Sequence, residues 1–439
     1  MDNTFPRVMN SSIPLSHSIA HERMNTKYNI YEISYIILFL FLFPQSILSQ
    51  VIDGFEYGDE VFGIIGLVTF INHYTRKRIL EKYPKVMKMF YLAFSVAIIG
   101  WIGTFLHGIQ KNFIVNLTDC FTILKFYFIF YLSLYLLNKS KINNIINPIF
   151  KITKLYIIFG SIFFIISQGV DIGMTPEVRF GIRTFKFINS NVGDYSSILI
   201  ISLVIFHIVS YYKRKPLRIL KGLTIILIIF TFRGKALGFM ATYLMAVFLI
   251  DHFHKISKKA LIIIAILGIC GGYFQIRYYF LDNVTPRALF LANGIETANQ
   301  YFPTGAGFST YGSNMAKVHY SPLYRQYGFS KIWGMNEDEQ QFLNDNFWPM
   351  IMGQYGWIGM LLYIAILVLM FKIVNKQLYN KQLKIAGFSI FFLLLYSSVG
   401  GPIFVHYIGC ASIIIFSLIL KVNGDIPHII NEKRCIKSV

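Results

Sequence analysis

Residues 344–359, with the sequence NDNFWPMIMGQYGWIG, join the longest polar interval of the chain to an apolar run. The polar interval begins near Arg277, and the apolar run continues to about residue 371. The rest of the sequence consists mostly of apolar segments joined by short links. The interval 277–345 is therefore the one link long enough to build a site, and we expect the activity of the protein to lie there.

The composition excludes an ordinary soluble protein. Hydrophobic residues make up 55% of the 439 residues and charged residues 14%, whereas soluble domains carry about 25% charged residues. Apolar runs of roughly 18 to 25 residues recur along the chain, which is the length that crosses the hydrocarbon core as a helix. These runs do not alternate as the strands of a membrane β-barrel do. The sequence therefore predicts an all-α, polytopic integral membrane protein.

Hydropathy predicts about twelve transmembrane helices, with one long loop, 277–345, between the ninth and the tenth. The predicted spans are about 33–50, 59–74, 89–108, 119–137, 153–168, 194–212, 219–232, 236–251, 260–276, 346–371, 385–399 and 403–420. Residues 1–32 are predicted to form a cytoplasmic N-terminal tail, 33–421 the transmembrane domain, and 422–439 a second cytoplasmic tail. The first apolar run is too long for a cleaved signal peptide, so we expect it to remain as a span.

The formal net charge of +20 has a topological explanation. Lysines and arginines cluster in short links between spans, as the positive-inside rule requires of cytoplasmic links, so no nucleic-acid partner is predicted. The alternation of charge places three segments on the outer face: 169–193, the turn at Arg233, and the loop 277–345. The four cysteines show no CxxC spacing, and neither a disulfide framework nor a metal site nor a cofactor is predicted.

Arg233 and Lys235 are the most informative charges. They lie in the turn between two apolar spans, on the side that the charge rule disfavours. Ionisable groups at such depth are costly and often functional, and a guanidinium suits phosphate oxygens. The alternative is a pair of snorkelling residues that only end a helix.

Other candidates lie in the two longer outer loops. Arg179 and Arg183 are four residues apart and would share one face if the segment were helical. Arg287 follows Pro286 at the predicted start of a helix, where an anion is favoured; a plain helix start is the alternative.

The remaining candidate site residues of the long loop are two glycines and one carboxylate. Gly305 and Gly307 permit a tight turn close to a ligand. Asp345 suits a general base, although an N-cap role explains an Asp at that position equally well. The loop aromatics either stack on sugars or form an interfacial belt.

In their order and topology, these residues resemble the O-antigen ligase and polymerase superfamily of bacterial envelope proteins. The matching segments are Arg183 with Asn189 and Asn191, Thr231-Phe232-Arg233-Gly234, Arg287, Gly305-Ala306-Gly307, Asp345-Asn346, and Gln354-Tyr355-Gly356-Trp357-Ile358-Gly359. Where the ligases have a catalytic histidine this chain has Asp345, which favours the polymerase branch.

The resemblance implies a glycosyltransferase in the bacterial inner membrane with a periplasmic active face. It would polymerise oligosaccharide repeat units, carried on polyprenyl pyrophosphate, into O-antigen or capsule. Arg233 and Arg287 would stabilise the departing pyrophosphate, and Asp345 would deprotonate the acceptor hydroxyl. The substrate-binding residues implied are Arg183, Lys235, Asn191, Gly305, Gly307 and Asn346.

Two other functions stay open at this point. A ligase would move finished polymer to an acceptor, and a flippase or exporter would place charged residues within its spans along a central path. The implied partners are the lipid-linked donor and acceptor, membrane lipid, and a protein that regulates chain length.

Overall fold

The computed structural model of the chain describes residues 28–179, 181–253, 277, 285–344 and 346–424. The predicted ninth span, Asp345 and most of the two predicted tails lie outside these residues. The described residues are mostly helical, with one two-stranded hairpin as their only sheet. The all-α fold class is thereby confirmed for this part of the chain.

Eight of the described helices are long and apolar enough to cross a membrane. They are α5 (Pro84–His107), α6 (Phe113–Asn138), α7 (Ile142–Gly169), α8 (Val192–Tyr212), α10 (Gly234–Phe253), α15 (Phe347–Gln377), α16 (Lys381–Val399) and α17 (Tyr407–Gly424). Asparagine caps begin several of them: Asn112, Asn191 and Asn380 each accept hydrogen bonds from the first turn of α6, α8 and α16.

Three other predicted spans form shorter helices. The first becomes α1 (Ile30–Leu42) and, beyond Pro44, α2 (Gln45–Leu48). The others are α3 (Gly58–Ile71) and α9 (Arg218–Ile229), of 14 and 12 residues, fewer than the ~20 that cross the hydrocarbon core upright. The described chain has the character of a multi-pass membrane protein, while the count of twelve spans and their sidedness stay predictions.

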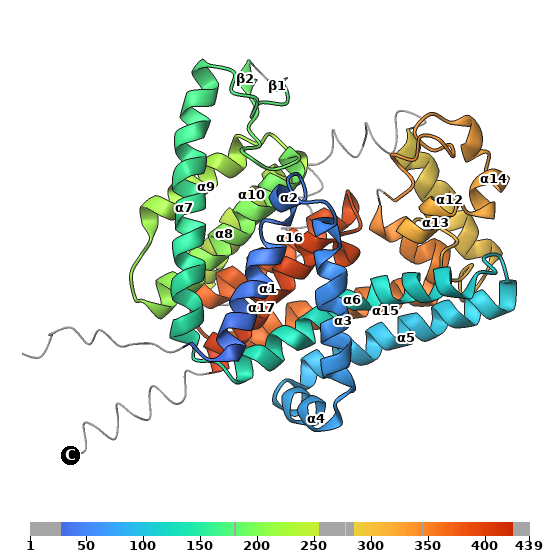
Figure 1. Cartoon of the computed structure of the whole chain (residues 1–439), viewed down its shortest axis with the longest axis horizontal. Coiled ribbons are helices and arrows are strands. Elements are labelled where there is room, and N and C mark those ends of the chain that lie inside the picture. The colour runs from blue at the N-terminus through green and yellow to red at the C-terminus, as the bar shows by residue number, and fades with distance from the viewer. Residues whose placement is uncertain (1–27, 180, 254–276, 278–284, 345, 425–439) are drawn as a thin grey trace, which may run out of the picture.

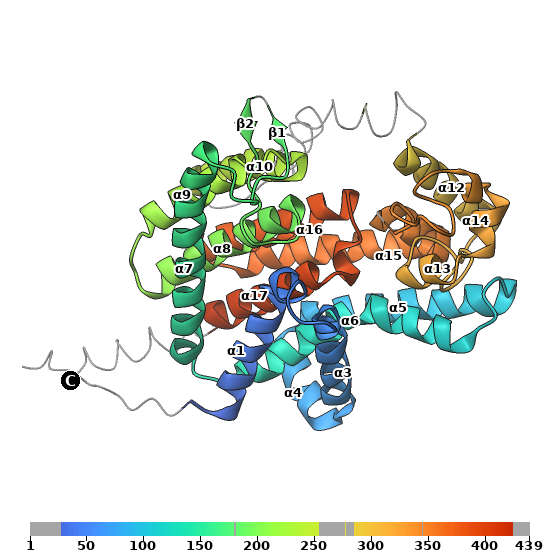
Figure 2. The same ribbon diagram turned by 45° about the horizontal axis from the view of Figure 1, so that its top comes forward.

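The long helices differ in how much surface they bury. More than three quarters of the apolar window is buried in α6, α8, α16 and α17, against fewer than half in α5, α7, α10 and α15. α17 contacts α6, α8 and α16, so the first set forms the centre. Figures 1 and 2 show α16 and α17 in the middle, with α7 along one edge and α5 along the other.

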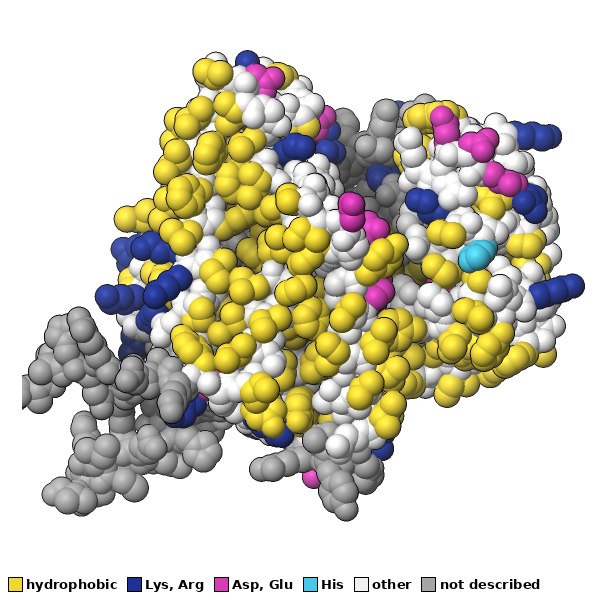
Figure 3. All heavy atoms as spheres, in the orientation of Figure 1, with side chains coloured by type: hydrophobic (Ala, Val, Ile, Leu, Met, Phe, Trp, Pro, Cys, Tyr) yellow, Lys and Arg dark blue, Asp and Glu magenta, His cyan; other side chains and the backbone are white. Residues whose placement is uncertain are grey.

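The peripheral helices present apolar side chains outward. On α7, Leu155, Phe159, Ile162 and Ile165 are exposed at a spacing of three to four residues, which places them on one helical face. Figure 3 shows apolar side chains over much of the face that α7, α1 and α3 form. Such a surface suits contact with lipid.

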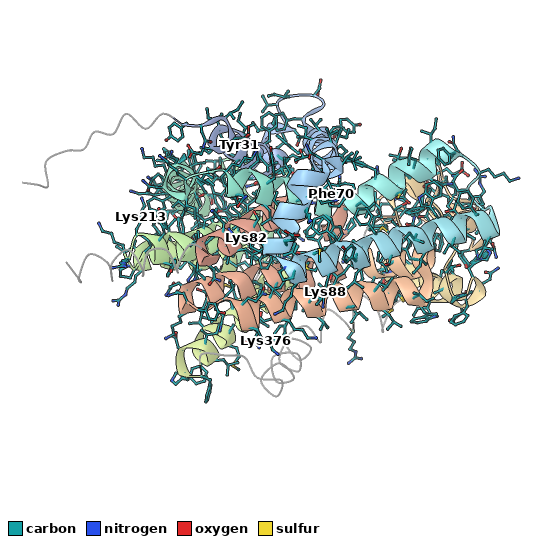
Figure 4. All side chains as sticks on the ribbon, turned by 90° about the horizontal axis from the view of Figure 1, so that it is seen from below. Tyr31, Phe70, Lys82, Lys88, Lys213 and Lys376 are labelled. Carbon is teal, nitrogen blue, oxygen red and sulfur yellow. The ribbon has the colours of Figure 1, made fainter. Side chains whose placement is uncertain are left out.

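Lysines from separate segments gather on the side of the bundle away from the long loop. Lys85 is electrostatically coupled to Lys88 on α5 and to Lys372 and Lys376 on α15. Figure 4 labels Lys88 and Lys376, with Lys82 of α4 (His73–Lys82) and Lys213 after α8, in this part of the molecule. These lysines come from the links that the sequence assigns to the cytoplasm.

The segment between α7 and α8, which the sequence assigns to the outer face, contains a hairpin and no helix among its described residues. Strand β1 (Val178–Arg179) pairs antiparallel with β2 (Ile182–Arg183), with Val178 opposite Arg183. The condition for Arg179 and Arg183 to share a helical face is therefore not met, because the two residues lie on paired strands. Gly181, with φ +75°, occupies the tight turn that closes the hairpin.

The long loop folds into a lobe with a small core of its own (Figure 1). Its elements are α12 (Pro286–Gln300), α13 (Asn314–Val318), α14 (Pro322–Gln326) and the 3₁₀ turn η3 (Phe329–Lys331). Phe290, Tyr311, Tyr324 and Phe329 are fully buried in this core. Tyr311 and Tyr324 therefore belong neither to an interfacial belt nor to an open sugar face.

The lobe is fixed to the bundle where α15 is kinked. Gly356 has φ 62° and ψ −165°, which interrupts the helix. The N–H groups of Ala306 and Gly307 donate to the carbonyl oxygens of Gly353 and Gln354 at 2.8 and 3.0 Å. The loop turn thus satisfies carbonyl groups that a straight helix would pair internally.

Gly307→Ala should weaken this attachment. Gly307 has φ +93°, and a Cβ there would collide with the backbone nitrogen of Thr104 on α5. Overpacking and the left-handed conformation together should lower the free energy of unfolding by about 2–4 kcal/mol, measured by denaturant or thermal unfolding of the purified protein.

Gly222→Ala is the matched control, because Gly222 lies in α9 with open space around its Cβ position. It should leave stability unchanged or raise it by about 0.5–1 kcal/mol. Equal stability of the two variants would contradict the packing role of Gly307.

Candidate functional site

A cavity of about 500 Å³ lies where the long-loop lobe meets the helix bundle. Its wall combines the segment from α2 to α3, the first half of α6, the start of α13, the start of α15, and the connection before α17. Figure 3 shows a hollow between the lobe and the hairpin side, with acidic and basic side chains around it. The polar residues of the wall are Gln45, Ser49, Glu56, Tyr57, Asp59, Glu60, Thr118, Asp119, Thr122, Lys125, Ser313, Asn314, Asn344, Tyr355, His406 and Tyr407.

The charged centre of the wall is a triad on α3 and α6. The Nζ of Lys125 lies 2.5 Å from both Asp59 Oδ2 and Glu60 Oε1. Lys125 and Asp59 are 2% and 3% exposed, so neither charge has bulk water to solvate it. Gln45 Nε2 donates to Asp59 Oδ1 at 3.1 Å and so positions that carboxylate. The lysine is held in place by the two acids, as a buried cation requires.

Asp119 joins the cavity wall to the long loop. It is 3% exposed on α6, and its Oδ2 accepts hydrogen bonds from Ser309 N at 2.7 Å and Gln354 Nε2 at 2.8 Å. Ser309 also donates from Oγ to the carbonyl oxygen of Val115. The carboxylate therefore fixes the turn after Gly307 against α6 and α15.

His406, in the connection just before α17, lines the cavity. The ring is electrostatically coupled to the carboxylates of Asp194 and Asp59. Lys125 and Lys235 also act on this ring. This electrostatic coupling links Lys235 and Asp194 to the wall of the cavity.

The turn between α9 and α10 carries surplus positive charge. Arg233 lies 3.5 Å from Glu177 Oε1, and Arg179 lies 3.1 Å from Glu177 Oε2. Arg179 also donates to the carbonyl oxygen of Phe232 at 3.0 Å, a residue held at φ +47°. One carboxylate thus serves two guanidinium groups, and the buried Nε of Arg233 has no hydrogen-bond partner among the described residues.

Lys235 lies in the first turn of α10, and Asn191 is the N-cap residue of the neighbouring α8. Lys235 Nζ donates to Ser197 Oγ at 3.2 Å, and its charge is coupled to those of Arg233 and Asp194. Asn191 caps α8 by accepting from Asp194 N at 2.8 Å. The structure therefore brings Arg233, Lys235 and Asn191 into one region and gives Asn191 a capping role there.

Arg183 is directed to a different partner. Its guanidinium donates to the carbonyl oxygen of Ser167 at 3.2 Å, near the end of α7. Gln168 in turn donates to the Arg183 carbonyl oxygen at 3.1 Å. These bonds attach the hairpin to α7, and a role of Arg183 in binding substrate stays a prediction.

The long-loop candidates are placed at the lobe's two ends. Arg287 is the second residue of α12, half-buried, after the Thr285 cap, which confirms the predicted helix start. Gly305 and Gly307 face the backbone of α15 and α5 respectively. That packing is a sufficient reason for both glycines, and their binding role stays a prediction.

The start of α15 bears on the two predictions for Asp345. The N-cap position belongs to Asn346, which is 2% exposed and makes no capping hydrogen bond with its side chain. Asp345 itself lies outside the described residues. Its neighbour Asn344 lines the cavity.

The residues that sequence analysis did not single out are Asp59, Glu60, Asp119, Lys125 and His406. One signal was available, because Lys125 interrupts the apolar run Ile123-Leu124-Lys125-Phe126 in a predicted span, and an ionisable residue there suggests function. Its partners could not be found by spacing, since Asp59 and Glu60 lie on a separate helix. Among the described residues, no three His, Cys, Asp or Glu side chains gather closely enough to hold a metal ion.

Comparison with known proteins gives no assignment. No model of a known protein family matches this chain, and no curated protein matches it. Function therefore has to be argued from the site.

Lys125→Met should be strongly destabilising. Removing the lysine leaves the buried Asp59 and the partly buried Glu60 without a counter-charge. Such a loss costs about 3–5 kcal/mol in comparable buried pairs. Unfolding of the purified protein measures this loss. Lys381→Met removes one side of the exposed Lys381–Asp251 pair and should change stability by less than about 1 kcal/mol. A similar, small effect of both substitutions would show that the triad is not needed to hold α3 against α6.

Proposed function

We propose that this protein polymerises oligosaccharide repeat units, carried on polyprenyl pyrophosphate, into a bacterial surface polysaccharide at the outer face of the inner membrane. The observation that carries the proposal is the surplus of positive charge at the α9–α10 turn, close to a carboxylate-lined cavity. A glycosyl transfer from a lipid pyrophosphate needs both: cations for the leaving group, and an acceptor site with a base.

The cationic part suits the donor. As the glycosidic bond to the pyrophosphate breaks, negative charge builds on the departing oxygen, and fixed cations stabilise that charge. Arg233 has an unused buried donor, Nε, and Lys235 lies beside it. We assign the pyrophosphate to these two residues, with Arg287 as a third contact supplied by the lobe.

The acidic part suits the acceptor. A carboxylate within reach of the attacking hydroxyl can take its proton as the new glycosidic bond forms. Asp345 is our candidate for this base, supported by the position of its neighbour Asn344 in the cavity wall. The polyprenyl chains of both substrates would stay in the membrane against the exposed apolar faces of the outer helices.

An exporter is the second candidate function, because one observation favours it. The triad of Lys125, Asp59 and Glu60 is a buried charged cluster between two apolar helices, and such clusters mark ion and substrate paths in transporters. The same experiment separates the two functions.

Deletion of the protein should leave single repeat units on the carrier and no long polymer on the carrier or at the cell surface. The measurement is the size distribution of the glycan in both places. Long chains trapped on the periplasmic carrier would instead indicate a ligase. Single units confined to the inner leaflet would indicate an exporter and overturn the proposal.

Arg233→Ala and Arg287→Ala should each abolish polymer while the protein still inserts in the membrane. Loss of one charge-assisted contact to the leaving group costs roughly 3–4 kcal/mol, or about 10²–10³-fold in rate. Arg325→Ala is the control, since Arg325 is an exposed lobe arginine paired with Glu337; its polymer should be unchanged. Wild-type polymer from the first two variants would remove them from the site.

Asp345→Asn separates a base from a structural residue. Asparagine keeps the size and hydrogen-bonding capacity of the side chain but cannot accept the proton, so polymer should be lost with normal protein levels. Normal polymer from this variant would assign the base to another carboxylate.

A further inference from the structure

The cavity wall contains hydrogen-bond acceptors that no group in the described part of the chain satisfies. Gln45 is 3% exposed, and its Nε2 donates to Glu56 O and Asp59 Oδ1, while its Oε1 has no partner within the described ranges. Glu60 uses Oε1 for Lys125, while Oε2 is buried and without a partner among the described residues. Buried acceptors left unpaired cost about 1–3 kcal/mol each, so a ligand that donates to both would recover that free energy.

Two other acids of the wall, Asp59 and Asp119, are already occupied. Asp59 is held by Lys125 and Gln45, and Asp119 by Ser309 and Gln354. The buried atoms of the wall without a hydrogen-bond partner among the described residues are Gln45 Oε1, Glu60 Oε2 and the Tyr407 hydroxyl. The amide and carboxyl oxygens can accept hydrogen bonds from a ligand, and the hydroxyl can accept or donate one.

The charge of the wall restricts the ligand further. Four carboxylate residues line the cavity, namely Glu56, Asp59, Glu60 and Asp119, against one lysine, Lys125, and one histidine, His406. Lys125 is already committed to two of the four. A ligand group with a negative charge would be repelled, whereas hydroxyl or ammonium donors would be attracted.

Size and shape agree with a small polar ligand. A volume of about 500 Å³ lies within the roughly 300–1,000 Å³ of small-molecule sites. Tyr57 and Phe121 supply aromatic surface, and Ser313, Asn314 and Asn344 supply further polar groups on the lobe side. The combination of aromatic surface with many hydrogen-bonding groups is suited to a saccharide.

We propose that this cavity binds one sugar residue of the acceptor, and that Gln45 and Glu60 select a neutral or amino sugar and reject an acidic one. The assignment of this sugar to the acceptor rests on the proposed function, whereas the binding specificity follows from the cavity alone. Hydroxyl groups of the sugar, or an ammonium group, donate to Gln45 Oε1 and Glu60 Oε2.

Saturation-transfer NMR on the full-length protein in lipid nanodiscs tests this specificity. Nanodiscs are needed because maltoside detergents present the same hydroxyl groups as the ligand. The probes are the methyl glycosides of glucose, galactose and mannose, their 2-amino analogues, and methyl glucuronide. We expect transfer to at least one neutral or amino glycoside with millimolar affinity, and markedly weaker transfer to methyl glucuronide.

Two variants locate the binding. Glu60→Gln keeps the size of the side chain and leaves the Asp59–Lys125 contact in place; loss of the charged acceptor should weaken amino-sugar binding about tenfold. Asn314→Trp fills the cavity from an exposed position on the lobe and should remove binding of every sugar without touching the triad. Glu337→Gln, which changes an exposed carboxylate of the lobe outside the cavity, should bind as the wild type does.

Each result decides the proposal. Binding lost in Asn314→Trp and weakened in Glu60→Gln supports it. Binding of methyl glucuronide as strong as that of the neutral glycosides, wild-type binding by both cavity variants, or no binding of any probe overturns it. Arg233→Ala should keep the sugar signal, because Arg233 does not line the cavity. If the protein binds sugar here but its deletion leaves polymer length unchanged, the binding site stands and the proposed function is overturned.

Discussion

Backbone groups inside a bilayer have to be satisfied by the protein itself, and this constraint is most visible at the kink of α15. Gly356 interrupts the helix, and the N–H groups of Ala306 and Gly307 from the long loop satisfy two of its carbonyl groups. Asp119 accepts from the next part of the same turn and from Gln354. The position of the whole lobe, and with it the lobe side of the cavity, depends on this attachment.

The charged groups of the candidate site divide into two functional regions. Around the α9–α10 turn, Arg179 and Arg233 share one carboxylate, which leaves positive charge available to an anion. In the cavity, carboxylates outnumber the one lysine, which leaves acceptors available to hydroxyl or ammonium groups. His406 lies between them and is coupled to charges on both sides. The proposed reaction, which joins a pyrophosphate donor to a sugar acceptor, would make use of this separation of charge.

Sequence analysis located some of these residues and not others for identifiable reasons. Arg233 and Lys235 could be identified from the sequence because charges in a short turn between apolar spans are conspicuous. The hairpin was missed because a spacing of four residues between Arg179 and Arg183 fits a helix as well as a tight two-stranded turn. Gly305, Gly307 and Gly356 were recognised as short motifs, but nothing in their spacing indicated that they pack against each other.

The sequence by itself determined the helical membrane fold and the approximate bounds of its long helices, because the length of an apolar run and the charges at its ends are local properties that the bilayer acts on directly. Only the tertiary structure decided that Lys125 contacts Asp59 and Glu60, although Glu60 lies 65 residues away along the chain. It also decided that Gln45 and Glu60 each have an oxygen at the same cavity without a partner among the described residues. Such contacts depend on which faces of separate helices pack together, and helices that are apolar nearly all round carry little local information about that choice.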